Sequence, residues 1–358
     1  MKICNRCVMD TSDPDIVFYT KGCNHCKSAD ALPRPTEVEG WNHITKTVLK
    51  MKRQSKRYDC VLGLSGGVDS SWTAILAYCN NLHVLLTHFD NGFDDPRATR
   101  NIEKIASETG FDLVYQTMDF AEFNDIWKAH LLASVINIEQ VSDNAITAST
   151  YNLAKKNNIK WILSGSNFAT EAIVPKAWGY PNDDVKNIKD IHRKFGKLSM
   201  VTYPSLSYFE KVMMLRSGTM HLFSPLNYVD YNMKQAKESL AKMCGWEDYG
   251  YKHYESILTR FYQGYILPVK FGVDKRKSHF SSLICSQQMS REDALKELEK
   301  PPLDSNQVNQ DKKFVLSKLG MDETEFQEIM EKPIKSHLDF KNDRMIRKII
   351  SFAKKVVR

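Results

Sequence analysis

Four cysteines near the start of the 358-residue chain have the spacing of a metal site. Cys4 and Cys7 form one Cys-x-x-Cys pair, and Cys23 and Cys26 form a second. Each pair can bind one ion from a tight turn, and together they supply the four thiolates that Zn²⁺ prefers in closed structural sites. We therefore predict a structural zinc ion on these four residues, with an iron–sulfur cluster as the alternative.

A second segment has the composition of a phosphate-binding loop. Residues 65–71, Ser-Gly-Gly-Val-Asp-Ser-Ser, follow a short apolar run and lead directly into a helical one. The glycines let backbone amides converge on an anion, and the start of a helix adds unpaired amides and a favourable dipole. Asp69 would repel phosphate unless a cation intervened, so we predict that it holds Mg²⁺. The predicted nucleotide contacts here are Ser65, Gly66, Gly67, Asp69, Ser70 and Ser71.

Two further polar segments follow predicted strands. Asp90 and Asn91 come after the second strand, and Gly165, Asn167 and Glu171 come after a later one. The carboxyl ends of parallel strands meet at one edge of a sheet, where ligands bind. We expect the first four to contact the nucleotide and Glu171 to take part in catalysis. Asp90 and Glu171 can alternatively be turn or helix-capping residues.

The elements that must position these residues alternate between strand and helix. Apolar runs predict strands at 60–64, 84–89, 111–115 and 161–163. Helical periodicity predicts helices at 70–78, 95–108, 120–133 and 144–156, and again at 231–243 and 251–265. This order predicts an α/β fold in which helices cover both faces of a parallel sheet.

The whole-chain composition excludes several classes of protein. The chain has 50 basic and 43 acidic residues, and its net charge of +7 fits an anionic substrate without requiring nucleic acid. No apolar stretch reaches the roughly 18–20 residues of a membrane span, and the first residues have no secretory pattern, so we expect a cytoplasmic protein. The other four cysteines form no further pair, which disfavours sulfur transfer, and Cys60 and Cys79 are predicted core residues.

The loop at residues 65–70 is similar to the PP-loop of the N-type ATP pyrophosphatase superfamily. It is neither a Walker A loop, which needs a lysine after the glycines, nor a Gly-x-Gly-x-x-Gly fingerprint. In this superfamily the loop holds the pyrophosphate leaving group while a substrate oxygen attacks the α-phosphorus of ATP. The resemblance implies an adenine nucleotide alpha hydrolase-like fold, ATP and Mg²⁺ as cofactors, and an adenylated substrate.

The chain as a whole resembles the N-acetyl sugar amidotransferase (WbpG/PseA-like) family. Its most distinctive parts are residues 250–256 and 272–279, since both lie outside the common nucleotide-binding core. The resemblance weakens after about residue 305. It also covers residues 4–11, 23–26, 64–71, 88–92 and 165–171.

This resemblance implies a defined reaction. ATP would activate the amide oxygen of a nucleotide-linked N-acetyl sugar as an O-adenylyl imidate, and ammonia would then displace AMP to leave an acetamidino group. The products would enter surface polysaccharide, such as LPS O-antigen, or nonulosonic acids. Ammonia is expected from partner glutaminase and cyclase-like subunits, because the chain leaves no room for a glutaminase domain of its own.

Two charged segments suit this chemistry. Lys275 and Lys277 could neutralise pyrophosphate charge, and His253 or Glu255 could accept a proton from the attacking ammonia. Each segment also has a structural interpretation: a solvated turn around Lys275, and an exposed helix face around His253. The predicted catalytic set is Asp69, Glu171, His253, Glu255, Lys275 and Lys277.

These observations predict four regions. Residues 1–35 form a zinc-binding head with four cysteine ligands, and residues 36–57 form a basic linker helix. Residues 58–230 form a PP-loop ATP-binding adenylation domain, and residues 231–358 form a mostly helical region with substrate and pyrophosphate contacts. Residues 41–57 carry six basic and no acidic side chains. The alternative function is a PP-loop tRNA-modifying enzyme, of the thiolation or lysidine type, whose head and basic helix would contact RNA. A nucleotide-binding scaffold is the non-enzymatic alternative.

Overall fold

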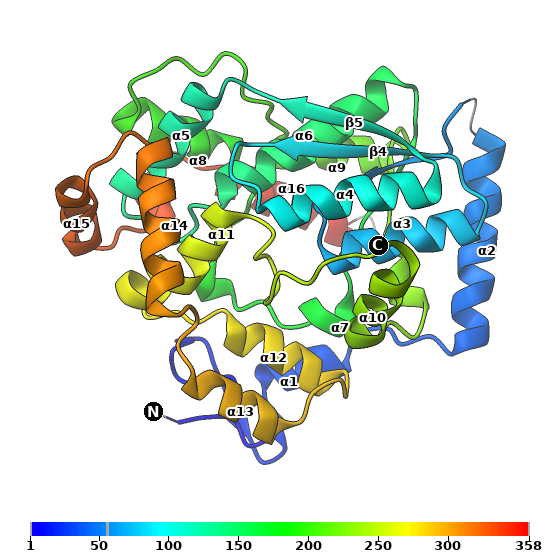
Figure 1. Cartoon of the computed structure of the whole chain (residues 1–358), viewed down its shortest axis with the longest axis horizontal. Helices are drawn as coiled ribbons and strands as arrows, with labels where there is room; N and C mark the ends of the chain where they lie inside the picture. Colours follow the sequence, from blue (N-terminus) through cyan, green and yellow to red (C-terminus); the bar gives the residue numbers. More distant parts are fainter. Residues whose placement is uncertain (1, 55–56, 357–358) are drawn as a thin grey trace.

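The computed structural model describes residues 2–54 and 57–356 of the chain (Figure 1). Lys56 of the predicted linker helix and residues 357–358 of the predicted C-terminal region lie outside the described residues. A five-stranded parallel sheet forms the centre of the molecule, in the order β5-β4-β3-β6-β7. The strands are β3 (Cys60–Gly63), β4 (Val84–Asp90), β5 (Asp112–Thr117), β6 (Trp161–Leu163) and β7 (His221–Phe223).

Helices cover both faces of this sheet because side chains alternate along each strand. Leu62 and Leu86 pack into an apolar cluster with α2 (Glu37–Gln54), α3 (Val68–Cys79), α4 (Pro96–Thr109) and α10 (Met233–Cys244). Val61 and Leu85 point the other way and pack on α6 (Gln140–Lys156). The predicted fold class, a parallel sheet with helices on both faces, is confirmed.

The last part of the chain is helical and packs against the sheet domain. Phe261 and Tyr262 share an apolar cluster with Phe93 after β4 and with Trp127 of α5 (Phe120–Leu132). The elements here are α11 (Ile257–Phe261), a π-helical segment (Tyr262–Phe271), α12 (Arg276–Cys285), α13 (Arg291–Glu299), α14 (Ser305–Lys318), α15 (Glu323–Glu331) and α16 (Arg344–Val356). The connection from β6 to α10 contains α7 (Phe168–Glu171), α8 (Val185–Phe195), α9 (Tyr208–Arg216) and β7.

The N-terminal head consists of a short hairpin, β1 (Phe18–Tyr19) and β2 (Gly22–Cys23), followed by α1 (Asn24–Asp30). Figure 1 shows it in blue beside α12 and α13. The Val8 amide donates to Ser281 Oγ of α12 at 3.2 Å, and the Arg291 guanidinium of α13 donates to the carbonyl oxygens of Cys4 and Cys7. The head is therefore tied to the C-terminal helices rather than to its neighbour in sequence.

Two predicted features are wrong. The helix predicted at 251–265 begins only at Ile257, because Ser256 caps it and His253 has a left-handed backbone (φ 66°) that no α-helix accepts. Cys79 is exposed at the end of α3, whereas Cys60 is buried as predicted. Within the described residues, every helix is too short or too polar to span a bilayer.

Candidate active site

The phosphate-type loop lies at the carboxyl end of β3, in the middle of the sheet. The strand ends at Gly63 and α3 begins at Val68, so the first amides of the helix lack acceptors within it. Gly66 has φ 78°, and a Cβ added there would lie 2.3 Å from the Ala98 carbonyl oxygen of α4. This glycine lets the loop turn tightly against α4 while its amides remain available to an anion.

Three cavities meet at His253, and two of them border the loop. The first, about 870 Å³, lies over Ser65, Gly67 and Asp69. The second, about 250 Å³, lies between the ends of β3 and β4 and the start of α6, and the third, about 660 Å³, lies beside residues 173–182. Among the described residues, His253 alone lines all three. Groups bound in different cavities could therefore approach one another at His253.

Asp69 lies in a compact network of charges. Lys252 Nζ is 2.5 Å from Asp69 Oδ2 and 2.9 Å from Glu171 Oε1. Lys252 also donates to Thr170 Oγ1 at 2.7 Å, and the Tyr231 hydroxyl donates to Asp69 Oδ1 at 2.5 Å. Burial lowers the pKa of Lys252, but Asp69 and Glu171 outweigh it and leave that pKa raised. Lys252 is therefore an ammonium cation held at the loop.

Glu255 lies between the first and second cavities. Its Oε2 is buried without a hydrogen-bond partner among the described residues, and a Cβ on Gly67 would lie 3.4 Å from its Oε1. His253 Nδ1 is 3.9 Å from that same Oε1. Burial lowers the pKa of His253, but the hydrogen bond and charge of Glu255 outweigh it and leave that pKa raised.

These oxygens fit a magnesium ion at the loop. Glu255 supplies a buried carboxylate oxygen that has no partner, and Asp69 supplies a second carboxylate beside the same glycines. Carboxylates together with phosphate oxygens are the usual ligands of Mg²⁺. When bound, the ion would neutralise charge on phosphate groups at the loop.

The second and third cavities share an acidic and basic wall. Lys275 Nζ lies 2.9 Å from Glu139 Oε2, and Gln263 donates to the same carboxylate at 3.0 Å. Asp143, one helical turn further along α6, also lines both cavities. Burial and, next, the charge of Glu139 raise the pKa of Asp143 to about 7.

Most of the predicted site residues come together at these cavities. Asn91 lines the second cavity and Lys275 the second and third. Gly165 packs so closely that an added Cβ would lie 2.9 Å from the Ser70 nitrogen. The predicted site residues that line the first cavity are Ser65, Gly67, Asp69, Ser70, Gly165, Glu171, His253 and Glu255.

Four predicted nucleotide contacts do not line the three cavities. Three of them have structural contacts, and the Ser71 hydroxyl has no hydrogen-bond partner among the described residues. The Gly66 carbonyl accepts from the Trp246 indole at 3.1 Å, and Ser71 is fully buried in α3. Asp90 accepts from the Gly92 amide at 2.7 Å, as a turn residue does. Asn167 caps α7 by accepting from the Thr170 amide at 2.9 Å.

The basic cluster at residues 275–277 separates in space. Lys275 pairs with Glu139, whereas Arg276 lines the first cavity and pairs with Asp274 at 2.7 Å. Lys277 points to the head, where its Nζ lies 2.5 Å from Asp10. Consecutive residues at the start of a helix point about 100° apart, so one cluster in the sequence serves three places.

Sequence reasoning missed the role of Lys252 in the site. Lys252 lies 183 residues from Asp69 in the chain, so no local pattern connects them. Tyr231 and Glu139 were also missed. The available signal was the run 250–256, in which three charged or titratable residues, Lys252, His253 and Glu255, closely follow a glycine.

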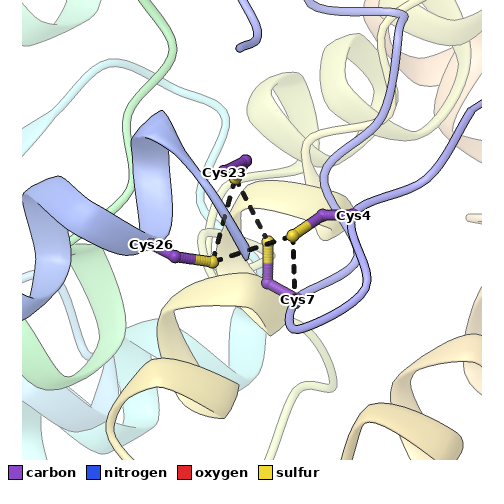
Figure 2. Close-up of side chains that lie close together, drawn as sticks. All are labelled: Cys4, Cys7, Cys23 and Cys26. Atoms are coloured by element: carbon purple, nitrogen blue, oxygen red, sulfur yellow. Dashed lines mark hydrogen bonds between the residues drawn. The ribbon is translucent and has the colours of Figure 1, made fainter. Parts of the chain in front are cut away.

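The four cysteine sulfurs of the head gather at one point (Figure 2). The Cys4–Cys26, Cys7–Cys23 and Cys23–Cys26 sulfur distances are 3.9, 3.8 and 3.8 Å. Four tetrahedral Zn–S bonds of about 2.3 Å place sulfurs about 3.8 Å apart. The site therefore fits a single zinc ion, whereas a cluster would need room for several irons and sulfides between the thiolates. His25 turns away and pairs with Asp13 at 2.6 Å.

A Ser-Gly-Gly loop between a central parallel strand and a helix, beneath the largest of three joined cavities, defines a PP-loop ATP pyrophosphatase fold. Residues 255–356 match the family described as LPS biosynthesis protein WbpG-like, C-terminal domain. The predicted resemblance to the WbpG-like family is confirmed for this part of the chain.

Comparison with solved structures finds similar chains. NMN synthetase from Francisella tularensis is 11% identical, with 84% of this chain and 98% of that chain covered and a TM-score of 0.38. NH3-dependent NAD synthetase from Campylobacter jejuni is 13% identical, with 80% and 98% covered and a TM-score of 0.33. NAD+ synthetase from Burkholderia pseudomallei is 14% identical, with 82% and 93% covered and a TM-score of 0.32. Comparison with curated proteins finds no match.

Proposed function

We propose that this chain is an ATP-dependent amidotransferase that converts the N-acetyl group of a nucleotide-linked sugar into an acetamidino group. The observation that carries the proposal is the junction of three cavities at His253. The WbpG-like domain supplies Glu255, Lys275 and His279 to the walls of these cavities. The substrate chemistry therefore belongs to this domain as much as to the loop.

The first proposed step is adenylation of the substrate. The amide oxygen attacks the α-phosphorus of ATP, a new P–O bond forms, and the bond to pyrophosphate breaks. An amide oxygen is a weak nucleophile, so positioning and charge stabilisation must lower the barrier. The amides at the start of α3, together with Lys252 and Arg276, stabilise the charge that develops on pyrophosphate.

The second proposed step replaces oxygen by nitrogen. Ammonia attacks the imidate carbon, and the C–O bond to AMP breaks. Glu255 accepts a proton from the nitrogen, directly or through His253, and the amidine remains on the sugar. The ammonia comes from a partner glutaminase with a cyclase-like subunit, and the reaction takes place in the cytoplasm for surface polysaccharide or nonulosonic acid synthesis.

Sulfur transfer to tRNA is the less favoured function. Among the described residues that line the three cavities there is no cysteine. Cys60 and Cys285 are buried elsewhere, and Cys79 lies at the far end of α3 from the loop. A persulfide carrier within this chain is therefore not placed near the site.

The test is mass spectrometry of nucleotide sugars incubated with the protein, ATP, Mg²⁺ and ammonium. We expect a UDP- or CMP-linked diacetamido sugar to exchange one oxygen for NH while AMP and pyrophosphate accumulate. If no such sugar stimulates AMP release, the proposed function is wrong.

The variant Asp69→Asn sharpens this test. We expect AMP formation to fall by at least about 100-fold, since the loop loses a carboxylate and its pair with Lys252 while the side-chain shape is kept. Asp230→Asn, at an exposed aspartate outside the three cavities, is the matched control and should stay active.

A further inference from the structure

The third cavity has the features of a separate binding site. It lies between residues 173–182 and the start of α12, with a volume of about 660 Å³. It joins the first cavity at Glu171 and His253, and it joins the second cavity at Asp143 and Lys275. A molecule bound here can therefore reach His253, where the three cavities join, without entering the second cavity.

A row of hydrogen-bonding groups runs along one wall. Asn137 Nδ2 donates to Asn182 Oδ1 at 2.7 Å, and Asn182 Nδ2 donates to Asp143 Oδ2 at 2.6 Å. Asn137 Nδ2 also donates to the Tyr180 carbonyl at 2.7 Å, which fixes the row in place. Asp143 Oδ1 accepts no hydrogen bond from the described residues, so it remains free for a hydroxyl group.

Other lining residues are apolar or aromatic. Ile173 and Trp178 are among them, and the Trp178 indole N–H already donates to the Ser12 carbonyl at 3.3 Å. Tyr180 also lines the cavity, and its ring stacks on His337 at 4.2 Å between centroids. A cavity that combines apolar side chains with a row of amides and a carboxylate suits a sugar, which has C–H faces and equatorial polar groups.

A cation lies among the lining residues that are open to solvent. Lys176 is exposed and has no ion-pair partner within residues 2–54 and 57–356. A free ammonium group beside a sugar-sized cavity suits the diphosphate of a nucleotide-linked sugar.

We propose that the third cavity binds the acceptor: the sugar lies against the Asn137–Asn182–Asp143 row, and its diphosphate meets Lys176. This inference rests on the proposed function and adds the place where the substrate binds and the residues that select it. Asn182 is a specificity-determining residue in this arrangement, because it links both ends of the row.

Binding of UDP-N-acetylglucosamine, measured by titration calorimetry, tests the assignment. We expect Asn182→Leu to weaken binding by about tenfold or more, since it breaks two hydrogen bonds of the row and leaves their partners unpaired. Lys176→Met should weaken binding by about threefold and flatten its salt dependence. Binding of a non-hydrolysable ATP analogue is measured in parallel and should not change.

Asn152→Leu is the matched control, because Asn152 is exposed on α6 and lines none of the three cavities. If the wild-type protein binds the UDP sugar and Asn182→Leu binds it equally well, the cavity assignment is wrong and the proposed function stands. If the wild type binds the ATP analogue but neither UDP-N-acetylglucosamine nor a UDP- or CMP-linked diacetamido sugar, the proposed function fails and this inference fails with it.

Discussion

His253 combines an unfavourable backbone with a central position. Its φ of 66° is left-handed, a conformation that costs a residue with a Cβ about 1 kcal/mol or more. The ring lies 5.5 Å from that of His279 and near Glu255, where the three cavities join. A strained backbone at such a junction supports the proposed role of the ring in the chemistry.

Two variants distinguish the role of the His253 ring from the strain of its backbone. His253→Gly and His253→Ala both remove the ring, so both should lose AMP formation by about 100-fold or more. Only glycine accepts the left-handed backbone without strain, so we expect the glycine variant to be more stable than the alanine variant by about 1 kcal/mol. Urea denaturation measures the difference, and a fully active glycine variant would contradict a role for the ring.

At the scale of elements, the junction of β3 and α3 depends on a close approach to α4. Gly66 is held between the Ala98 carbonyl and the Trp246 indole, so neither the loop nor α4 can move independently. The helix that carries the loop amides is thereby fixed relative to β4, whose end borders the second cavity. The precision of the site comes from this contact between elements.

Gly66→Ala tests that contact. The added Cβ meets a carbonyl oxygen at 2.3 Å in a left-handed backbone, so we expect a loss of about 3 kcal/mol or more in the free energy of unfolding. Gly110→Ala has a similar φ of 68° but open space around it, and should cost only about 1 kcal/mol. Equal losses in thermal or urea denaturation would show that backbone strain alone accounts for the effect.

The elements differ in how well the sequence predicts them. The strands at 60–64 and 84–89 stand out because they are buried on both faces and therefore read as continuous apolar runs. The strand β7, His221–Phe223, was not predicted. It lies at the edge of the sheet and depends on its pairing with β6, which the sequence does not show. The loop at 250–256 was predicted as helix because its apolar and aromatic spacing is helical, while the left-handed His253 leaves no mark on that pattern.

The site residues also differ in how well the sequence predicts them. The loop residues and the two Cys-x-x-Cys pairs could be proposed as sites because each of these patterns is local in the sequence. Two contacts of the site, Lys252 with Asp69 and Asn182 with Asp143, join residues that are far apart in the chain. A single sequence does not reveal that such residues are close in space. Lys277 illustrates the reverse error, since charge type alone does not reveal which way a helical side chain points.

For the whole molecule, the cysteine site and the core are one structure. The four cysteines belong to the same apolar cluster as Trp127, Phe261 and Phe326, which lie on three different helices. We expect the purified protein to hold one zinc ion and Cys23→Ser to lose it. Because the head shares this core, the variant should also lower the melting temperature of the whole protein by about 5 °C or more.

Elemental analysis and a thermal melt measure both effects. Cys79→Ser is the control, since Cys79 is exposed and outside the cluster, and it should keep both the metal and the melting temperature. A metal-free Cys23→Ser protein that melts as the wild type does would mean that the head does not contribute to global stability.

Acid should destabilise the molecule through two buried histidines. Burial lowers the pKa of His130 to about 4 and that of His337 to about 3, whereas in the unfolded chain each is near 6.5. The unfolded state therefore binds more protons between pH 6.5 and about 4, so stability falls as the pH falls through this window. For His130 alone we expect a loss of about 3 kcal/mol by pH 4.

Urea denaturation at several pH values checks this expectation. His130→Gln should flatten the decline between pH 6.5 and 4, while His83→Gln, at an exposed histidine, should leave it as in the wild type. A decline of unchanged slope in His130→Gln would assign the acid sensitivity to other groups.

The walls of the first cavity include residues 65–70 and residues 249–300, which are made at very different times during synthesis. When a ribosome has completed the sheet, the loop amides exist, but Lys252, Glu255 and Arg276 have not yet been added. A nascent chain at that stage has the loop without the groups that, in the proposed function, act on ATP. We therefore expect nucleotide chemistry to begin only when the last third of the chain has folded back.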